Sequence, residues 1–184
     1  MADTAFKRAT YDHLLALPEN VVGEIVSGVL YSQPRPAPRH VIAAHRLSGQ
    51  LEPPFGFGTG GPGNWVFAGE PELHLGEEIL VPDVAGWRRE HFVPPEGAYF
   101  EQVPDWICEL LSPSTARHDR INKMTQYAAF GVQYAWLIDP IAETLEAYRL
   151  EKGQWLQIAA LAEKGEVAVE PFAAAPFSLE TLWL

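Results

Sequence analysis

Two acidic residues stand among apolar neighbours near the middle of the chain, where carboxylates could take part in catalysis. Asp83 lies in the run of residues 79–87, and Glu109 is the only charge in the run 106–111. Burying a carboxylate costs roughly several kcal/mol unless a partner compensates its charge. We therefore expect such a partner, and a divalent cation beside a lysine is the sharpest candidate. The alternatives are that Asp83 only begins a turn after Pro82 and that Glu109 points to water from an edge strand.

A lysine for this site follows on a predicted helix. Asp119, Lys123 and Tyr127 recur every four residues and so share one helix face. The adjoining apolar stripe consists of Ile121, Met124 and Ala128. If the first face is exposed, it carries a surface Asp–Lys pair worth roughly a few tenths of a kcal/mol. If it faces the carboxylates, the Lys123 ammonium can orient or deprotonate a water and stabilise developing charge.

Glu24 and His40 are further candidates. Glu24 is the only charge in residues 21–31, and it is either an exposed hairpin residue or an additional acid of the site. His40 stands on the apolar stripe of a predicted helix, where a buried, hydrogen-bonded histidine is favoured over a ligand. A zinc site that adds His13 and His45 is disfavoured, because the spacings match no zinc pattern and the chain has one cysteine.

Length and composition predict one domain that spans residues 1–184. The chain is 47% hydrophobic and 20% charged, as is typical of globular proteins. No apolar run reaches the roughly 18 residues of a membrane span, and residues 1–8 lack the apolar core of a secretory signal. Cys108 is the only cysteine, so it is expected to be a buried, inert thiol. These features predict a cytoplasmic location.

The net charge of −11 limits contact with nucleic acid. Only 13 basic residues oppose 24 acidic ones, and no run of Lys or Arg is present. Proteins that bind phosphates tightly display a basic face. Binding to DNA is therefore expected to be weak and local, around Arg35, Arg39, Arg46, Arg117, Arg120 and Lys123.

Turn residues and hydrophobic periodicity divide the chain into expected elements. In the first third these are a helix at 11–17 with Thr10 as its N-cap, a hairpin at 21–31, a helix at 39–51 with the stripe His40, Ala44, Leu47 and Leu51, and a flexible turn at 53–63. The remainder has strands at 65–75, 79–87, 106–111, 133–139 and 167–169, a helix at 115–130 ended by Gly131, a loop at 88–102, a hairpin at 144–161 and a turn at 178–183. Helices set among strands predict an α/β fold with a mixed sheet.

The ordered set of motifs resembles the PD-(D/E)XK nuclease superfamily and, more narrowly, the Uma-two-type restriction endonuclease family. The resemblance covers most of the chain, through Thr10-Tyr11, Glu24-Ile25-Val26-Ser27-Gly28, Pro38-Arg39-His40, Val81-Pro82-Asp83-Val84, Glu109-Leu110-Leu111-Ser112-Pro113, Lys123, Tyr127 and Trp136-Leu137-Ile138-Asp139-Pro140. The superfamily pattern places a lysine two residues after the second acid, where this chain has Leu111. In the Uma-like group the following helix supplies the lysine, which corresponds to Lys123.

The resemblance implies a four- or five-stranded mixed sheet flanked by helices, with added β-hairpins. It implies that Asp83, Glu109 and the carbonyl of Leu110 hold Mg²⁺ or Mn²⁺. Glu24 would be a further catalytic acid, Lys123 would assist a water, and His40, Asp119 and Tyr127 would support the site, with Asp119 or Tyr127 fixing Lys123. The implied reaction is hydrolysis of DNA phosphodiester bonds that leaves a 5′-phosphate.

Three functions remain open at this point. The first is a metal-dependent endonuclease, for which a homodimer is a candidate assembly, since nucleases that cut both strands often pair symmetric subunits. The second is a non-catalytic nucleic-acid-binding or regulatory module on the nuclease fold, which the acidic charge and Leu111 favour. The third is a metal-dependent hydrolase of another substrate.

Overall fold

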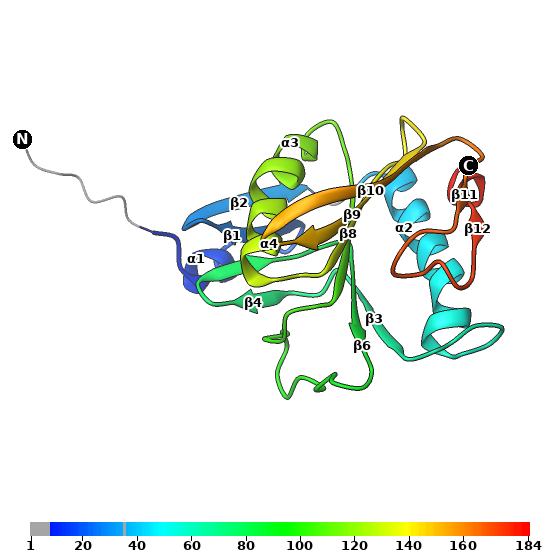
Figure 1. Ribbon diagram of the computed structural model, residues 1–184. Coiled ribbons are helices and arrows are strands. Elements are labelled where there is room, and N and C mark those ends of the chain that lie inside the picture. Colours follow the sequence, from blue (N-terminus) through cyan, green and yellow to red (C-terminus); the bar gives the residue numbers. More distant parts are fainter. Residues whose placement is uncertain (1–7, 35) are drawn as a thin grey trace, which may run out of the picture.

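A six-stranded mixed sheet forms the centre of the structure (Figure 1). The computed structural model describes residues 8–34 and 36–184. In the order of the sheet the strands are β10 (Gln154–Ala162), β9 (Thr144–Glu151), β8 (Tyr134–Asp139), β7 (Trp106–Leu110), β6 (Val84–Arg88) and β3 (Trp65–Gly69). β7 and β8 are parallel, and the other neighbours are antiparallel. The predicted mixed α/β class is confirmed, with six strands where the resemblance implied four or five.

Strand β7 lies inside this sheet, and all five of its residues are buried. Trp106, Cys108 and Leu110 join the hydrophobic cluster on one face, and Ile107 joins the cluster on the other. Because side chains alternate along a strand, Glu109 lies on the face of Ile107. The predicted buried strand is therefore confirmed, and the alternative that Glu109 points to water from an edge strand is wrong.

A second sheet of four strands meets the first where the chain passes from one to the other. Its order is β2 (Val29–Pro34), β1 (Val21–Val26), β5 (Glu78–Leu80) and β4 (Leu73–Leu75), and the β1–β2 hairpin confirms the one predicted at 21–31. The single strand predicted at 79–87 is wrong, because residues 81–83 link β5 to β6 and Pro82 has no N–H for a ladder. The strand predicted at 65–75 is also divided, at Glu70, whose φ is 47°, and at Pro71.

Helix α2 (Pro38–Leu51) covers one face of the central sheet (Figure 1). Its buried residues are Ala43, Leu47 and Leu51, so the predicted stripe is shifted and His40 lies to one side of it. The π-helix η1 (Glu52–Gly56) prolongs α2 and buries Phe55. The flexible turn predicted at 53–63 is therefore wrong over its first residues, where an aromatic side chain enters the core.

A helical segment in three parts covers the opposite face of the sheet. It comprises α3 (Ala116–His118), the π-helix η2 (Asp119–Lys123) and α4 (Met124–Phe130). Gly131 ends the segment with a φ of 84°, which confirms the predicted helix and its terminator. The predicted apolar stripe is wrong at Ile121, which is 56% exposed, because the wider π turn changes which side chains face the sheet.

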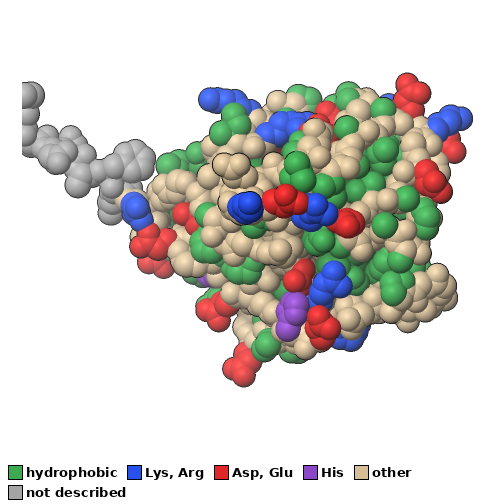
Figure 2. Space-filling model, viewed as in Figure 1, with side chains coloured by type: hydrophobic (Ala, Val, Ile, Leu, Met, Phe, Trp, Pro, Cys, Tyr) green, Lys and Arg blue, Asp and Glu red, His purple; other side chains and the backbone are tan. Residues whose placement is uncertain are grey.

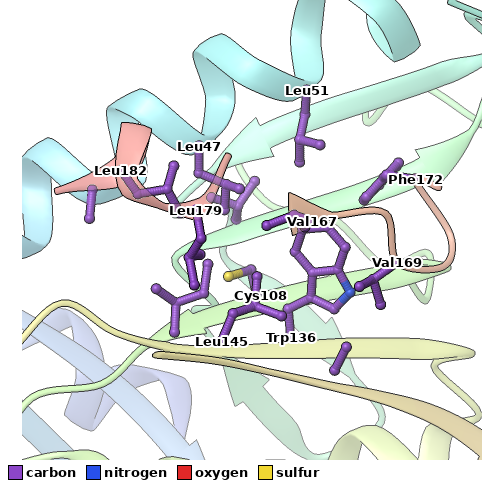
Figure 3. Packing of buried hydrophobic residues seen from close by; sticks show 14 of the residues in the cluster. Leu47, Leu51, Cys108, Trp136, Leu145, Val167, Val169, Phe172, Leu179 and Leu182 are labelled. Carbon is purple, nitrogen blue, oxygen red and sulfur yellow. The ribbon is translucent and has the colours of Figure 1, made fainter. Parts of the chain in front are cut away.

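An aromatic cluster fills the core between α2, the central sheet and the C-terminal segment. Phe172 lies at its centre, with ring centroids 4.9–5.5 Å from those of Phe55, Trp65, Phe67, Trp106 and Trp136. Figure 3 shows Leu47 and Leu51 of α2 and Leu179 and Leu182 above the strands, with Cys108 among them. Cys108 is buried, as predicted.

The remaining elements are short. Helix α1 (Tyr11–Leu15) is two residues shorter than predicted, β11 (Glu166–Val167) pairs with β12 (Phe177–Ser178), and a 3₁₀ turn η3 (Leu179–Leu182) follows. The β9–β10 hairpin is confirmed. Arg35 and the N-terminal segment 1–7 lie outside the described residues. Within the described ranges, the helices lack the combined length and apolar character that a bilayer span requires.

Replacing Phe172 with alanine should lower the free energy of unfolding by about 3–5 kcal/mol, because it leaves a cavity between five aromatic rings. Urea unfolding monitored by circular dichroism measures the change. Leu156→Ala is the control, since Leu156 is 45% exposed on β10 and should change stability by less than about 1 kcal/mol. A loss for Phe172→Ala no larger than that of the control would contradict this description of the core.

Candidate active site

The ammonium group of Lys123 is the centre of the candidate site. Its Nζ lies 2.8 Å from Oε1 of Glu24, 2.8 Å from Oε1 of Glu109 and 3.0 Å from the carbonyl oxygen of Val81. A lysine ammonium carries three hydrogens, so each of them has an acceptor. Lys123 is 1% exposed, and the alternative of a surface Asp–Lys pair is therefore wrong.

The π-helix η2 positions this lysine. Asp119 and Lys123 are its first and last residues, both are buried, and Tyr127 follows on α4, also buried. A π turn is wider than an α turn and often occurs at functional sites. Here the predicted polar face of the helix points inward, and Lys123 forms ion pairs with Glu24 and Glu109.

Glu24 joins the four-stranded sheet to the site. It lies on β1, is 2% exposed, and its Oε1 also accepts the N–H of Val81 at 2.7 Å. The alternative of an exposed hairpin residue is therefore wrong. Burial alone would raise the pKa of Glu24, but the charge of Lys123 and the hydrogen bonds it accepts outweigh burial and lower the pKa to about 2.

Glu109 has a different electrostatic environment although it shares the same lysine. Its Oε1 also accepts the Tyr127 hydroxyl at 2.6 Å. Burial raises the pKa of Glu109 well above its ordinary value; Lys123 opposes the rise, while the charges of Asp119, Asp83 and Glu24 add to it. Burial and the same carboxylate raise the pKa of Tyr127. Tyr127 thus holds Glu109 directly, rather than fixing Lys123 as the resemblance implied.

Asp119 does not contact the lysine either. Among the described residues, the acidic groups within 4.0 Å of the Lys123 ammonium are Glu24 and Glu109. Asp119 acts on Lys123 at longer range, and burial raises the pKa of Asp119. Of the two residues expected to fix Lys123, neither forms a hydrogen bond or ion pair with its ammonium.

Asp83 lies on the link between the sheets and is held from two sides. Its Oδ2 accepts the N–H of Leu110 at 2.6 Å, and its Oδ1 lies 2.6 Å from Nε2 of His40 on α2. The bond to Leu110 ties Asp83 to the end of β7, one residue after Glu109. Burial alone would lower the pKa of His40, but the hydrogen bond and charge of Asp83 raise it.

One cavity of about 270 Å³ lies beside Lys123, and Glu24 and Tyr127 are not among the described residues that line it. Its titratable lining residues are His40, Glu70, Asp83, Glu109, Asp119 and Lys123. Within the described part of the chain, the fully buried charged side chains are three acids and one base, namely Glu24, Glu109, Asp119 and Lys123. Buried acids therefore outnumber the buried base, and burial raises the pKa of two of these acids, Glu109 and Asp119, because an unpaired charge is costly in this region.

The chemistry of these donors fits a divalent cation. Carboxylate and carbonyl oxygens are the ligands of Mg²⁺, which binds through one or two carboxylates and keeps several waters. Asp83, Glu109 and Leu110 line the same cavity, and a cation there would stabilise the ionised form of Glu109, which burial disfavours. The described residues contain no group of three or more His, Cys, Asp or Glu side chains arranged to hold a metal, so waters and backbone would have to complete the shell.

Two residues of the site were missed at the level of sequence. Glu70 lines the cavity beside Asp83, and its N–H donates to the Asp83 carbonyl; its place in a strand predicted to be continuous concealed it. The ring of His118 lies against that of Tyr31, with centroids 4.0 Å apart and an angle of 37° between the planes, and its Nε2 lies 3.7 Å from Oε2 of Glu24. In the sequence, the position of His118 directly before the candidate residue Asp119 could have indicated it.

Comparisons with known proteins identify one matching family and one solved structure with a similar fold. Residues 9–181 match the model of the Uma2 family, which is described as "Putative restriction endonuclease". None of the curated proteins matches the chain. Among solved structures, the crystal structure of a "putative nuclease" belonging to DUF820 from Anabaena variabilis ATCC 29413 superposes with a TM-score of 0.72. The two sequences are 23% identical, and the match covers 95% of this chain and 97% of the other.

Replacing Lys123 with methionine should lower the free energy of unfolding by about 3–5 kcal/mol, because Glu24 and Glu109 then remain buried without their cation. Chemical denaturation at neutral pH measures the loss. Lys164→Met is the matched control, since the Lys164–Glu180 pair is exposed and contributes at most about 1 kcal/mol. Equal stability of the two variants would contradict the role of Lys123 as a buried counter-ion.

The lowered pKa of Glu24 predicts a contribution to stability that depends on pH. Because folding lowers this pKa from 4.5 to about 2, the contribution is complete above about pH 4.5 and is lost as the pH falls toward 2. The difference in unfolding free energy between wild type and Glu24→Gln should therefore shrink by on the order of 3 kcal/mol over that window. Urea unfolding at a series of pH values measures it, and a constant difference would contradict the assigned ionisation.

Proposed function

This chain belongs to the Uma2 family, and from that premise we propose that it is a single-domain nuclease that hydrolyses phosphodiester bonds of DNA. The observation that carries the proposal is the meeting of Asp83 and Glu109 in one cavity, in a region where buried acids outnumber buried bases. Asp83, Glu109 and the carbonyl of Leu110 would hold Mg²⁺ or Mn²⁺. When bound, such an ion polarises a phosphodiester and favours attack by water.

The contacts of Lys123 support a role as a fixed positive charge. Burial would lower its pKa, but Glu109 and Glu24 raise it above its ordinary value, so the amine keeps its proton. All three N–H groups already have acceptors. Proton abstraction from water by Lys123 is therefore disfavoured, and its charge instead holds Glu24 and Glu109 in place and opposes charge that develops on the phosphate.

His40 and Tyr127 would act through the carboxylates that they contact. His40 orients Asp83 from α2 and, when protonated, adds a positive charge to the wall of the cavity. Tyr127 donates to one oxygen of Glu109 and so sets the direction of the other. Both are positioning residues in this proposal.

DNA would have to approach this acidic protein through local contacts. On the face shown in Figure 2, Lys and Arg side chains are scattered among Asp and Glu rather than gathered in a patch. Two of the candidate basic residues are already engaged, since Arg120 forms a bidentate pair with Glu146 and Arg46 contacts backbone carbonyls near the C-terminus. This distribution agrees with weak binding. A two-fold dimer stays a prediction.

A second candidate is a binding or regulatory module without catalysis. The saturation of Lys123 by three acceptors, together with Leu111 at the position of the superfamily lysine, favours it. In that case Lys123 would serve stability alone. Binding of DNA that leaves the strands intact, and that is unaffected by a chelator, would support this candidate.

Cleavage of supercoiled plasmid and of single-stranded DNA in Mg²⁺ or Mn²⁺ tests the nuclease directly. The wild type should convert both substrates, and Asp83→Asn and Glu109→Gln should each lower the rate at least about 100-fold, because each removes a charge that holds the ion. A chelator should abolish cleavage, and products should carry 5′-phosphates.

Glu96→Gln is the matched control, since Glu96 is an exposed acid of the loop between β6 and β7. It should cleave at the wild-type rate. Equal cleavage by the wild type, Asp83→Asn and Glu109→Gln would indicate a contaminant and would contradict the proposal. Hydrolysis of a small phosphodiester without cleavage of DNA would indicate that the natural substrate is a phosphodiester other than DNA.

A further inference from the structure

A water that attacks a phosphodiester must lose a proton, and the residues discussed so far are poorly suited to accept it. The amine of Lys123 keeps its own proton, and its three N–H groups already have acceptors. Asp83 and Glu109 would serve as ligands of the ion, and a carboxylate beside a cation is a weak base. The proposed reaction therefore needs a further group that can take up a proton.

Asp119 is a third carboxylate on the wall of the same cavity. It is the first residue of η2, one turn before Lys123, and it is 3% exposed. The cavity of about 270 Å³ that Asp83 and Glu109 line is also lined by Asp119. Its N–H donates to the Thr115 carbonyl at 2.9 Å, so its backbone is fixed within the helical segment. Asp119 is thus buried in the protein but adjoins the space in which a substrate would react.

The carboxylate of Asp119 is less engaged than those around it. In the part of the chain that the structure describes, Glu24, Asp83 and Glu109 each accept hydrogen bonds from two donors. For Asp119 the donor is the side chain of Thr115. Because a carboxylate has about four lone-pair sites, Asp119 can still accept a hydrogen bond from a water in the cavity.

The surroundings of Asp119 make it a stronger base than an ordinary aspartate. Burial raises its pKa; the charge of Lys123 and the hydrogen bond of Thr115 oppose the rise, and the charges of Glu24 and Asp83 add to it. A base is most effective when its pKa approaches the working pH. The titratable groups that interact with Asp119 are Lys123 and Tyr127 of the helical segment, Glu24 of β1, Asp83 of the link, Glu109 of β7 and His40 of α2.

The two other titratable residues of the cavity wall are less suitable. His40 directs its Nε2 to Asp83 at 2.6 Å, where it positions a proposed ligand of the ion. Glu70 is exposed, so it lacks the burial that favours protonation of Asp119. Asp119 is therefore the lining residue that combines burial, free lone pairs and a position beside the proposed ion ligands.

We propose that Asp119 is a catalytic residue that accepts the proton of the attacking water. The water oxygen forms a bond to phosphorus while one of its protons passes to the Asp119 carboxylate. The bond between phosphorus and the 3′-oxygen breaks, and that oxygen takes a proton from solvent; Asp119 then releases its own proton to solvent. This inference rests on the proposed function, and it goes beyond it by naming Asp119, rather than Lys123, as the base.

Replacing Asp119 with asparagine should separate catalysis from folding. Plasmid cleavage in Mg²⁺ should slow at least about 100-fold, since general bases contribute on this order. The free energy of unfolding at neutral pH should not fall, because folding raises the pKa of Asp119 and its charge therefore opposes folding once the pH exceeds that pKa. Urea unfolding measures the second quantity. Asp12→Asn is the matched control, since Asp12 is exposed on α1 and the variant should match the wild type in both assays.

The pH dependence of cleavage and rescue by a small acid identify the role of the carboxylate. The wild-type rate should rise with pH as Asp119 ionises, and this limb of the profile should be absent from Asp119→Asn. Formate should accelerate cleavage by Asp119→Ala at least about 10-fold, because it supplies a carboxylate base to the vacated space, whereas chloride at the same ionic strength should not. An asparagine variant that keeps the wild-type profile, or that loses stability together with activity, would overturn the assignment.

Binding of Mn²⁺, measured by calorimetry without DNA, distinguishes a base from another ligand of the ion. Asp119→Asn should lose much less affinity than Asp83→Asn, which removes a proposed ligand. An equal loss in the two variants would assign Asp119 to the ion and overturn its role as the base. If the wild type cleaves DNA and Asp119→Asn cleaves it equally fast, the base is wrong and the nuclease stands. If the wild type cleaves no DNA, both proposals are refuted.

Discussion

A single buried ammonium group joins the parts of this protein that would do chemistry. Lys123 comes from the helical segment on one face of the central sheet, and its three acceptors belong to β1, β7 and the link between the sheets. Its charge helps to lower the pKa of Glu24 against the effect of burial, and it opposes the rise in the pKa of Glu109. The lysine therefore determines where the two sheets, the helical segment and the carboxylates lie relative to one another.

The link at residues 81–83 completes the candidate site, because Val81 and Asp83 both contact its other residues. Pro82 interrupts the strands, so the backbone of Val81 is free to donate to Glu24 and to accept from Lys123, while Asp83 reaches the end of β7. His40 reaches Asp83 from the other face of the sheet. Elements that pack on opposite faces thus contribute to one acidic cavity.

Much of this arrangement could be predicted from the sequence, because it follows from patterns among residues that are close together in the chain. The isolated charge of Glu109 in an apolar run and the four-residue spacing of Lys123 and Tyr127 indicated inward-facing polar groups. Register and long-range pairing could not be predicted in the same way. The break at Pro82 was concealed by the apolar residues around it, and the π turn at η2, which exposes Ile121, has no clear sequence signal. The partner of His40 depends on where α2 packs, which periodicity does not specify.

Diffraction from crystals soaked in Mn²⁺, recorded at an energy where manganese scatters anomalously, tests the central claim most directly. The arrangement of Asp83, Glu109 and Leu110 predicts one anomalous peak within ligand distance of both carboxylates and the Leu110 carbonyl, with Lys123 beside it. A structure in which the cavity stays free of manganese under these conditions, or in which the ion binds elsewhere while both acids keep their present contacts, would contradict it.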